Sequence, residues 1–285
     1  MIFRLVLLGA LVASTACAPA RITTTTRMPV LDAPAHRVVA LVPSMAEDLF
    51  AVGAGAAVVG VSVYTDYPPA AKKLPQVATF ASVSTERIVA LHPDLVVGII
   101  AQQRLVSDLR RAKVRTLLLH DDGYDDIFKN LRTLGAETGH VAGAAASVLQ
   151  LRARTSAILA SVAPRARKPS VFIVLGTAPI FTVGRGSYID TLIGMAGGSN
   201  AASGVTQPYA RYSAEALLAR QPDVLIADPD VHLGDVLGQA PWSALRAVRE
   251  HRVYVLPDGA ILERPGPRYN EGLAWLVATL ARVPT

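Results

Sequence analysis

Aromatic and arginine side chains gather in loop segments of this 285-residue chain, three of which follow predicted strands and two of which precede the copies of an internal repeat. Loops at the carboxyl ends of strands line the ligand crevice of open α/β sheets, and these side chains would suit a large, flat, polar or partly anionic ligand. Any one loop is better explained as apolar cover for its own sheet, but five of them favour a cleft. The segments are residues 63–69, Phe80, 181–186, 208–212 and 263–269.

Constellations typical of catalysis are scarce, so the sequence predicts a binding protein without catalytic residues. Residues 197–201 (Gly-Gly-Ser-Asn-Ala) lack the second glycine of a nucleophile elbow and follow a helical pattern instead of a strand. Gly53, Gly55 and Gly60 follow a helix and precede a strand, which is the wrong order for a dinucleotide-binding loop. The six histidines are scattered without ligand spacing, and we expect neither a metal site nor a cofactor.

One acidic segment keeps a second function class open. Residues 120–126 (His-Asp-Asp-Gly-Tyr-Asp-Asp) contain four carboxylates that could hold a cation in a metal-dependent exported enzyme. The same segment lies where a predicted strand passes into a helix over residues 127–134, and aspartates are favoured at helix N-termini. Helix capping is therefore the simpler explanation, and the enzyme is the competing class.

The basic charge of the chain is dispersed. Lys and Arg number 28 against 22 Asp and Glu, which gives a net charge of +6. Arginines such as Arg110, Arg152 and Arg167 are spread out, and no basic run interleaves with aromatic residues. Nucleic acid is therefore not an expected partner.

The N-terminal residues have the pattern of an export signal. Arg4 is followed by an apolar run over residues 5–13, too short to span a bilayer, and then by small residues before Cys17, the single cysteine. Residues 1–16 are predicted to be removed, and residues 17–36, rich in Thr, Pro and Ala, to act as a tether. The surroundings of Cys17 resemble the lipobox of bacterial lipoproteins, which implies lipidation of Cys17 and an exported, membrane-anchored protein. Ordinary signal cleavage nearby is the alternative.

Short β-branched runs alternate with helical patterns along the rest of the chain. Continuous apolar strands separated by helices are typical of mainly parallel sheets covered on both faces, so the sequence predicts an α/β fold. The expected strands are residues 37–42, 57–61, 95–100, 114–119, 171–175, 224–227 and 253–256.

A long helix is expected between the two groups of strands. Residues 140–163 carry apolar side chains close to helical spacing, with Gly139 before them and Pro164 after them. At about 1.5 Å per residue this helix would extend roughly 36 Å, enough to run along two lobes and join them. We expect an N-terminal lobe over residues 37–139 and a C-terminal lobe over residues 164–285. A crossover helix inside one sheet is the alternative.

An internal repeat supports two lobes of similar plan. Residues 84–97 align without a gap on residues 213–226, at an offset of 129 residues. Each copy has a Ser suited to N-capping, a Glu in the first helical turn and a Pro-Asp pair before a buried strand. One copy precedes the long helix and one follows it. Chance similarity of helix–strand units is the alternative.

Six segments carry a family resemblance. They are residues 37–44 (Arg-Val-Val-Ala-Leu-Val-Pro-Ser) with Glu47, 64–69 (Tyr-Thr-Asp-Tyr-Pro-Pro), 86–94, 181–184, 196–200 and 263–268. Together they resemble the periplasmic solute-binding proteins of cobalamin and iron–siderophore ABC importers, over about residues 37–281. The segment at residues 64–69 favours the cobalamin-binding members.

The resemblance implies two Rossmann-like lobes joined by the long helix, little hinge motion, and a ligand cleft between the lobes. It implies a monomeric substrate-binding component that captures cobalamin or a related corrinoid and delivers it to a permease dimer with ATPase subunits. One glutamate of each lobe, Glu86 and Glu215, would dock onto arginines of the permease. The corrinoid would meet Tyr64, Phe80, Phe181 and Tyr209, with Asp258 and Arg264 or Arg268 near its polar side chains.

The sequence departs from the cobalamin-binding pattern where specificity is decided. Tryptophans of the cobalamin binders correspond to Phe80, Tyr209 and about Ile99, and two extra residues stand between Asp258 and Glu263. Smaller aromatic faces offer less stacking area. A ferric siderophore or haem would use Tyr and Arg in the same cleft, and a structural or sensory lipoprotein is a further alternative.

Overall fold

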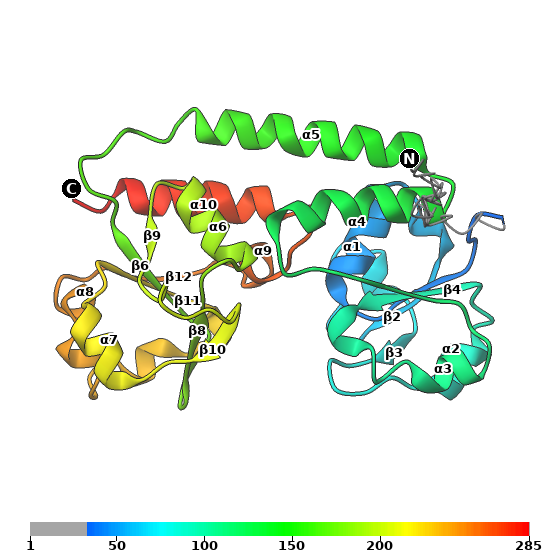
Figure 1. Cartoon of the computed structure of the whole chain (residues 1–285), viewed down its shortest axis with the longest axis horizontal. Helices are drawn as coiled ribbons and strands as arrows, with labels where there is room; N and C mark the ends of the chain where they lie inside the picture. The colour runs from blue at the N-terminus through cyan, green and yellow to red at the C-terminus, as the bar shows by residue number, and fades with distance from the viewer. Residues whose placement is uncertain (1–32, 285) are drawn as a thin grey trace, which may run out of the picture. The chain divides into compact units, whose positions relative to one another are not determined.

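The first half of the described chain builds a five-stranded parallel sheet, in a computed structural model that describes residues 33–284 (Figure 1). Its strands are β1 (Val38–Ala40), β2 (Val58–Ser62), β3 (Gln76–Ala78), β4 (Leu95–Ile99) and β5 (Thr116–Leu119). They follow the order β3-β2-β1-β4-β5, and every neighbouring pair is parallel. Four of these strands occur at predicted apolar runs. The edge strand β3 is missing from the prediction because it is short and begins with the exposed Gln76.

The second half builds a similar parallel sheet and a small antiparallel one. The strands are β6 (Ser170–Val174), β7 (Gly176–Thr177), β8 (Ile180–Val183), β9 (Ser199–Asn200), β10 (Tyr209–Arg211), β11 (Val224–Ala227) and β12 (Val253–Val255). The order β12-β11-β6-β9 is parallel throughout, which confirms the predicted α/β class with mainly parallel sheets. The antiparallel sheet β10-β8-β7 is a difference from the prediction, because its strands are too short to show a period of two.

Helices cover both faces of each parallel sheet. They are α1 (Pro43–Ala51), α2 (Thr85–Ala90), α3 (Ser107–Arg111), α4 (Tyr124–Glu137), α5 (Val141–Leu159), α6 (Tyr188–Met195), α7 (Ala214–Arg220), α8 (Arg246–Arg249), α9 (Ala260–Glu263) and α10 (Tyr269–Ala281). Successive side chains of a strand point to opposite faces. Val38 of β1 therefore packs in the core that includes Leu49 of α1 and Leu131 of α4, whereas Val39 packs in the core that includes Ile88 of α2 and Leu109 of α3.

The helix α5 connects the two halves of the described chain and packs against helices of both. It lies against α4, which belongs to the N-terminal lobe built on β1–β5, and against α10 of the C-terminal lobe built on β6–β12 (Figure 1). At α10, the side-chain amide of Asn270 donates to the carbonyl of Leu151 at 3.0 Å. The helix is shorter than the predicted 140–163, and its 19 residues extend about 28 Å. It is the predicted connecting helix.

One hydrophobic core runs through both lobes. Leu134 of α4, Leu151 of α5, Ile189 of α6 and Leu276 of α10 are buried in the same cluster. Residues 33–285 accordingly form a single compact unit, so the lobes are parts of one folded body rather than separate domains. Burial of this shared apolar surface opposes their separation.

The repeat has a structural counterpart in each lobe. Its copies form α2 followed by β4, and α7 followed by β11. The two serines differ, because Ser213 Oγ accepts from the amide of Ala216 at 3.0 Å, whereas Ser84 makes no side-chain cap. The two aspartates make equivalent hydrogen bonds. Asp94 accepts from the backbone amide of Arg37 at 3.0 Å, and Asp223 accepts from the backbone amide of Ser170 at 2.8 Å. Arg37 and Ser170 lie at the start of the first strand of their lobes.

The structure bears on one of the two expectations about the membrane. Among the residues it describes, none of the helices combines the length and apolar character needed to cross a bilayer. Cys17, the signal segment and most of the tether lie outside the described residues.

The fold analysis predicts that Asp223 is a larger source of stability than its repeat partner Asp94. The Asp223 side chain is fully buried, and it accepts hydrogen bonds from Arg167 Nη1 at 2.7 Å and from Ser170. Burial alone would raise its pKa, but these bonds outweigh burial and lower the pKa to about 2. We expect Asp223→Asn to reduce the free energy of unfolding by about 2–3 kcal/mol at pH 7, measured by urea denaturation.

The matched control is Asp94→Asn, which should cost about 1 kcal/mol or less because Asp94 is exposed and bonds only to backbone amides. The pKa of Asp223 is depressed by folding, so its contribution is complete above pH 4 and disappears as the pH falls from about 4 to 2. Equal losses of stability in the two variants would contradict the prediction.

Candidate functional site

A cavity of about 1350 Å³ lies between the two lobes, at the edge where their parallel strands end. Its walls include Ser44 after β1, Tyr64 after β2 and Asp121 after β5, and on the other side Asp228 after β11 and Asp258 after β12. The carboxyl ends of parallel strands are where α/β sheets form ligand crevices. The volume exceeds the roughly 300–1,000 Å³ of common small-molecule pockets, so the cavity is suited to a large ligand.

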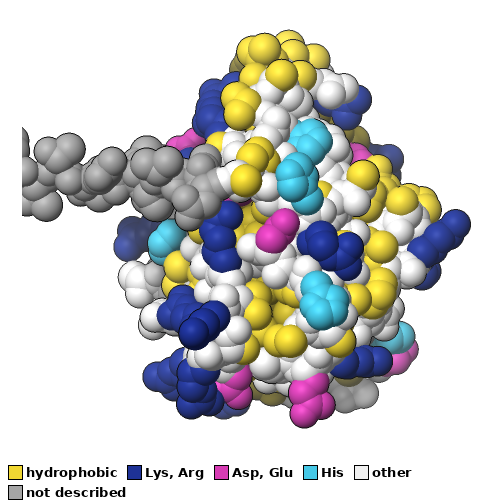
Figure 2. Space-filling model, turned by 90° about the vertical axis from the view of Figure 1, so that its right-hand side faces the viewer, with side chains coloured by type: hydrophobic (Ala, Val, Ile, Leu, Met, Phe, Trp, Pro, Cys, Tyr) yellow, Lys and Arg dark blue, Asp and Glu magenta, His cyan; other side chains and the backbone are white. Residues whose placement is uncertain are grey.

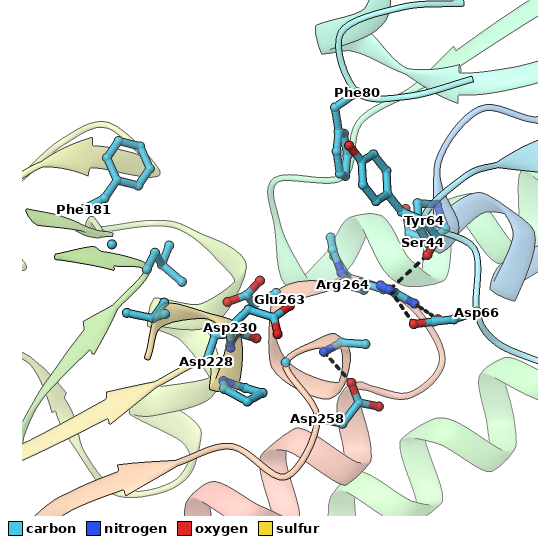
Figure 3. Close-up of a pocket in the computed structure, with 18 of the residues that line it drawn as sticks. Ser44, Tyr64, Asp66, Phe80, Phe181, Asp228, Asp230, Asp258, Glu263 and Arg264 are labelled. Atoms are coloured by element: carbon cyan, nitrogen blue, oxygen red, sulfur yellow. Dashed lines mark hydrogen bonds and ion pairs between the residues drawn. The ribbon is translucent and has the colours of Figure 1, made fainter. Parts of the chain in front are cut away.

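Aromatic rings face the cavity from both lobes. Tyr64 and Phe80 stack with their centroids 5.0 Å apart and an angle of 23° between the rings. Both side chains are about half exposed, at 47% and 59%, which leaves ring area free for a ligand. Phe181 of β8 lies on the opposite wall (Figure 3). The cavity thus offers apolar faces on two sides to a flat molecule.

Arg264 links the lobes at the floor of the cavity. Its guanidinium follows α9 in the C-terminal lobe and donates to three groups of the N-terminal lobe: Glu47 Oε1, Asp66 Oδ2 and the carbonyl of Tyr64, each at 3.2 Å (Figure 3). The hydrogen bond from Arg264 is the main reason that the pKa of Asp66 is lowered. Arg264 lines the cavity as expected of a ligand-binding residue, but most of its donors are already engaged between the lobes.

Glu47 is buried beneath Arg264. Its side chain lies in α1 with 3% of the residue exposed, and Oε2 has no hydrogen-bond partner within the described residues. Burial raises the pKa of Glu47 to about 7, although Arg264 acts in the opposite direction. Loss of the cation would leave a buried carboxylate uncompensated and would destabilise the fold. The Arg264–Glu47 pair therefore serves to join the lobes, and its charges are not free to bind a ligand.

Arg268 lies outside the lining of the large cavity. It donates to Asp258 Oδ2 at 2.8 Å and to Glu271 Oε2 at 3.2 Å, and its guanidinium carbon lies 4.6 Å from the ring centroid of Tyr67. It lines a smaller pocket of about 400 Å³ beside α5 instead. Asp258 does line the large cavity, so Arg268 reaches it through this carboxylate.

Tyr209 also lies outside the cavity lining. It belongs to β10, where it pairs with Val183 of β8 in the antiparallel sheet. Of the seven expected ligand contacts, the cavity therefore brings five together: Tyr64, Phe80, Phe181, Asp258 and Arg264. The other two adjoin the cavity, Tyr209 through its strand partner β8 and Arg268 through Asp258. Neither this strand pairing nor this ion pair can be derived from spacing along the chain.

Three acidic residues of the lining are absent from the sequence prediction: Asp228, Asp230 and Glu263. A fourth, Asp121, is considered there only as part of the acidic segment 120–126. The signal of the aspartates in the sequence is position, since Asp121 lies just after β5, and Asp228 and Asp230 lie just after β11. Two loops meet closely here: a Cβ at Gly259 would lie 1.5 Å from Asp228 Oδ2, so this approach requires glycine.

The acidic segment 120–126 is divided between structural roles. Asp126 accepts from the amide of Gly123 at 3.1 Å and thus caps α4, while the carbonyl of Asp122 accepts from the amide of Tyr188 in the other lobe at 2.8 Å. Asp121 alone of these residues lines the cavity. Within residues 33–284, no three His, Cys, Asp or Glu side chains are grouped as metal ligands.

The two docking candidates occupy equivalent exposed positions. Glu86 lies in the first turn of α2 and Glu215 in the first turn of α7. Both helices lie on the side of the molecule remote from α5, one in each lobe (Figure 1). On the face seen in Figure 2, the Lys and Arg side chains are scattered among acidic, polar and hydrophobic ones.

Comparison with known proteins agrees with this geometry. The family model described as periplasmic binding protein matches residues 38–260. The chain is 36% identical over 194 residues to the vitamin B12-binding protein of Salmonella choleraesuis (strain SC-B67), a match that covers 67% of this chain and 72% of that protein.

Two solved structures share the fold to a similar degree. The periplasmic vitamin B12-binding protein of Vibrio cholerae is 28% identical with a TM-score of 0.74, covering 87% of this chain and 97% of that one. The periplasmic heme-binding protein of Roseiflexus sp. RS-1, in its apo form, is 29% identical with a TM-score of 0.77, covering 86% and 97%. The extent of the family match and the identity to the Salmonella protein lead to one conclusion: this chain belongs to the periplasmic binding protein family.

Proposed function

We propose that this protein is the substrate-binding component of an ABC importer and that its cavity captures a corrinoid, either cobalamin or a close relative. The main support for a corrinoid ligand is the cavity itself, which has a volume of about 1350 Å³, with the Tyr64–Phe80 stack on one wall and Phe181 on the other. A corrin ring is large and flat and bears amide side chains. Aromatic faces would cover the ring, while polar residues such as Asp258 would meet the amides.

A ferric siderophore or haem is the second candidate. The observation that favours it is the hydroxyl-bearing Tyr64 in the cavity, since a tyrosine oxygen can ligate ferric iron. The similarity to the Roseiflexus heme-binding protein is close to the similarity to the cobalamin-binding structure, which supports keeping this candidate. In either case the chemistry is binding and release, and the proposal includes no catalytic step.

A titration distinguishes these ligands. We expect cyanocobalamin or cobinamide to bind at micromolar concentration or tighter and to raise the Tm, with haem and ferric siderophores binding at least tenfold more weakly. Tyr64→Ala and Phe80→Ala should each weaken corrinoid binding about tenfold, because each removes a stacking face. Absorbance titration and thermal shift measure both effects.

The control for that titration is Leu149→Ala, which removes an exposed apolar side chain (71% exposed) from α5, outside the cavity lining. It should leave the affinity unchanged. Absence of corrinoid binding by the unmodified protein would reject the corrinoid as ligand, and tight haem binding would establish the second candidate.

We also propose that Glu86 and Glu215 contact the permease. Their equivalent positions in the repeat give the protein one exposed carboxylate on each lobe, which suits a permease dimer with twofold symmetry. Preference of glutamate for helix N-termini explains each position singly but does not require the pairing.

The docking proposal predicts a separation of binding from transport. Glu86→Arg combined with Glu215→Arg should leave ligand affinity within twofold of the unmodified protein and reduce uptake, or permease-stimulated ATP hydrolysis, by tenfold or more. Each single variant should reduce uptake less than the double variant does, and the two single variants should reduce it by similar amounts. Charge reversal at the exposed Asp235 is the control, and normal transport by the double variant would rule out this docking mode.

Anchoring through Cys17 is proposed on sequence grounds. The predicted signal segment ends at this cysteine, and a lipidated N-terminus would keep the protein at the membrane beside its permease. Cys17→Ala should abolish incorporation of radiolabelled palmitate and release the protein into the soluble fraction. Unchanged labelling or unchanged fractionation in this variant would refute the anchor.

A further inference from the structure

The cavity is acidic, although the chain as a whole is basic. Of the described residues that line it, six carry carboxylates and one, Arg264, carries positive charge, whereas the net charge of the chain is +6. Arg264 pairs with Asp66, and Arg268 pairs with Asp258 from outside the cavity. Four carboxylates have no cationic side chain within 4 Å in the described part of the chain. They are Asp121, Asp228, Asp230 and Glu263.

Three of these four carboxylates form one acidic wall: Asp228, Asp230 and Glu263. Figure 3 shows them side by side, with the two aspartates from the loop after β11 and the glutamate from α9. Asp228 Oδ1 accepts from the amide of Asp230 at 2.7 Å, which fixes the loop. Burial against the cavity walls, followed by the charges of Asp228 and Asp230, raises the pKa of Glu263 to about 7. Negative charge is thus crowded on this wall, and within the described chain none of these three carboxylates forms a salt bridge, although the charge of Arg264 acts on Glu263.

The opposite wall carries the stacked rings of Tyr64 and Phe80, whose faces also attract cations. A flat ligand between the two walls would meet the stacked rings on one side and, on the other, Phe181 together with uncompensated carboxylates. The sequence favours a polar or partly anionic ligand because of arginines in the loops, but Arg264 and Arg268 are both engaged by carboxylates of the protein, so this lining favours a cationic ligand instead.

Resting on the proposed corrinoid function, we infer that the acidic wall makes this protein selective for corrinoids of net positive charge, such as cyanide-bearing ones that lack the phosphate-bearing nucleotide loop. A cobalt(III) corrin with one cyanide carries one positive charge, and the phosphate of the nucleotide loop cancels that charge in cyanocobalamin. Haem carries two propionates, which the same wall would repel. The acidic wall thus separates three flat macrocycles by charge.

The test compares aquacyanocobinamide, which carries one positive charge, with neutral cyanocobalamin. In Glu263→Gln combined with Asp230→Asn, two carboxylates become amides of the same shape. We expect this variant to bind aquacyanocobinamide about tenfold or more weakly than the unmodified protein, and cyanocobalamin within about twofold. Asp235→Asn is the matched control, because it removes one exposed carboxylate of the same lobe outside the cavity and should change neither affinity.

Proton linkage gives a second readout. Glu263 is faced by Asp228, Asp230 and Arg264, and its raised pKa means that it gains charge as the pH rises from about 6 to 8. Affinity for aquacyanocobinamide should therefore increase over this range in the unmodified protein, and the increase should be smaller in Glu263→Gln. Cyanocobalamin should show little pH dependence in either protein.

The outcomes separate this inference from the proposed function. Selective weakening of aquacyanocobinamide in the double variant supports the inference. Equal changes for both corrinoids, or none for either, overturn it while leaving a corrinoid-binding protein. Failure of both corrinoids to bind the unmodified protein overturns the inference and the proposed ligand together, and tight binding of haem would contradict both.

Discussion

The arrangement of the two lobes depends on the contact between Arg264 and Glu47. Glu47 belongs to α1 of the N-terminal lobe and is almost fully buried, whereas Arg264 approaches it from the C-terminal lobe. A buried carboxylate that loses its cation is strongly destabilised, so any movement that draws the lobes apart at this point is opposed. Arg264 also holds Asp66 and the carbonyl of Tyr64, which fixes the loop that carries a cavity-facing ring. The same arginine therefore joins the lobes and positions part of the cavity wall.

Hydrophobic packing reinforces this joint from behind. The helices α4, α5, α6 and α10 contribute to one buried cluster that spans both lobes, and α5 crosses from one lobe to the other. This continuous layer packs behind the cavity, whose walls are built largely from the loops at the strand ends. Those loops, together with α9, carry the aromatic rings and the acidic residues that line the cavity, and the packed helices position them.

The two lobes share a plan but contribute different chemistry. The repeat gives each lobe a helix, a Pro-Asp pair and a strand in the same order, and Asp94 and Asp223 hold the first strand in equivalent ways. The cavity walls do not follow this symmetry, since stacked rings come from the N-terminal lobe and the acidic wall from the C-terminal lobe. The similarity of the lobes is thus confined to the repeated helix–strand unit, and the cavity combines unlike walls.

The sequence by itself determined the fold class, the connecting helix and the paired exposed glutamates, because each depends on local periodicity or on a repeat that can be read along the chain. It also indicated Tyr64 and Phe80 as cavity residues, since Tyr64 follows a predicted strand and Phe80 lies in a predicted loop just before the first copy of the repeat. Only the tertiary structure decided the charge of the cavity. Arg264 and Arg268 are cations in the sequence, but partners distant in the chain occupy them, while Asp228 and Asp230 stay uncompensated. Which charges cancel depends on distances of a few ångströms between lobes, and no spacing along the chain contains that information.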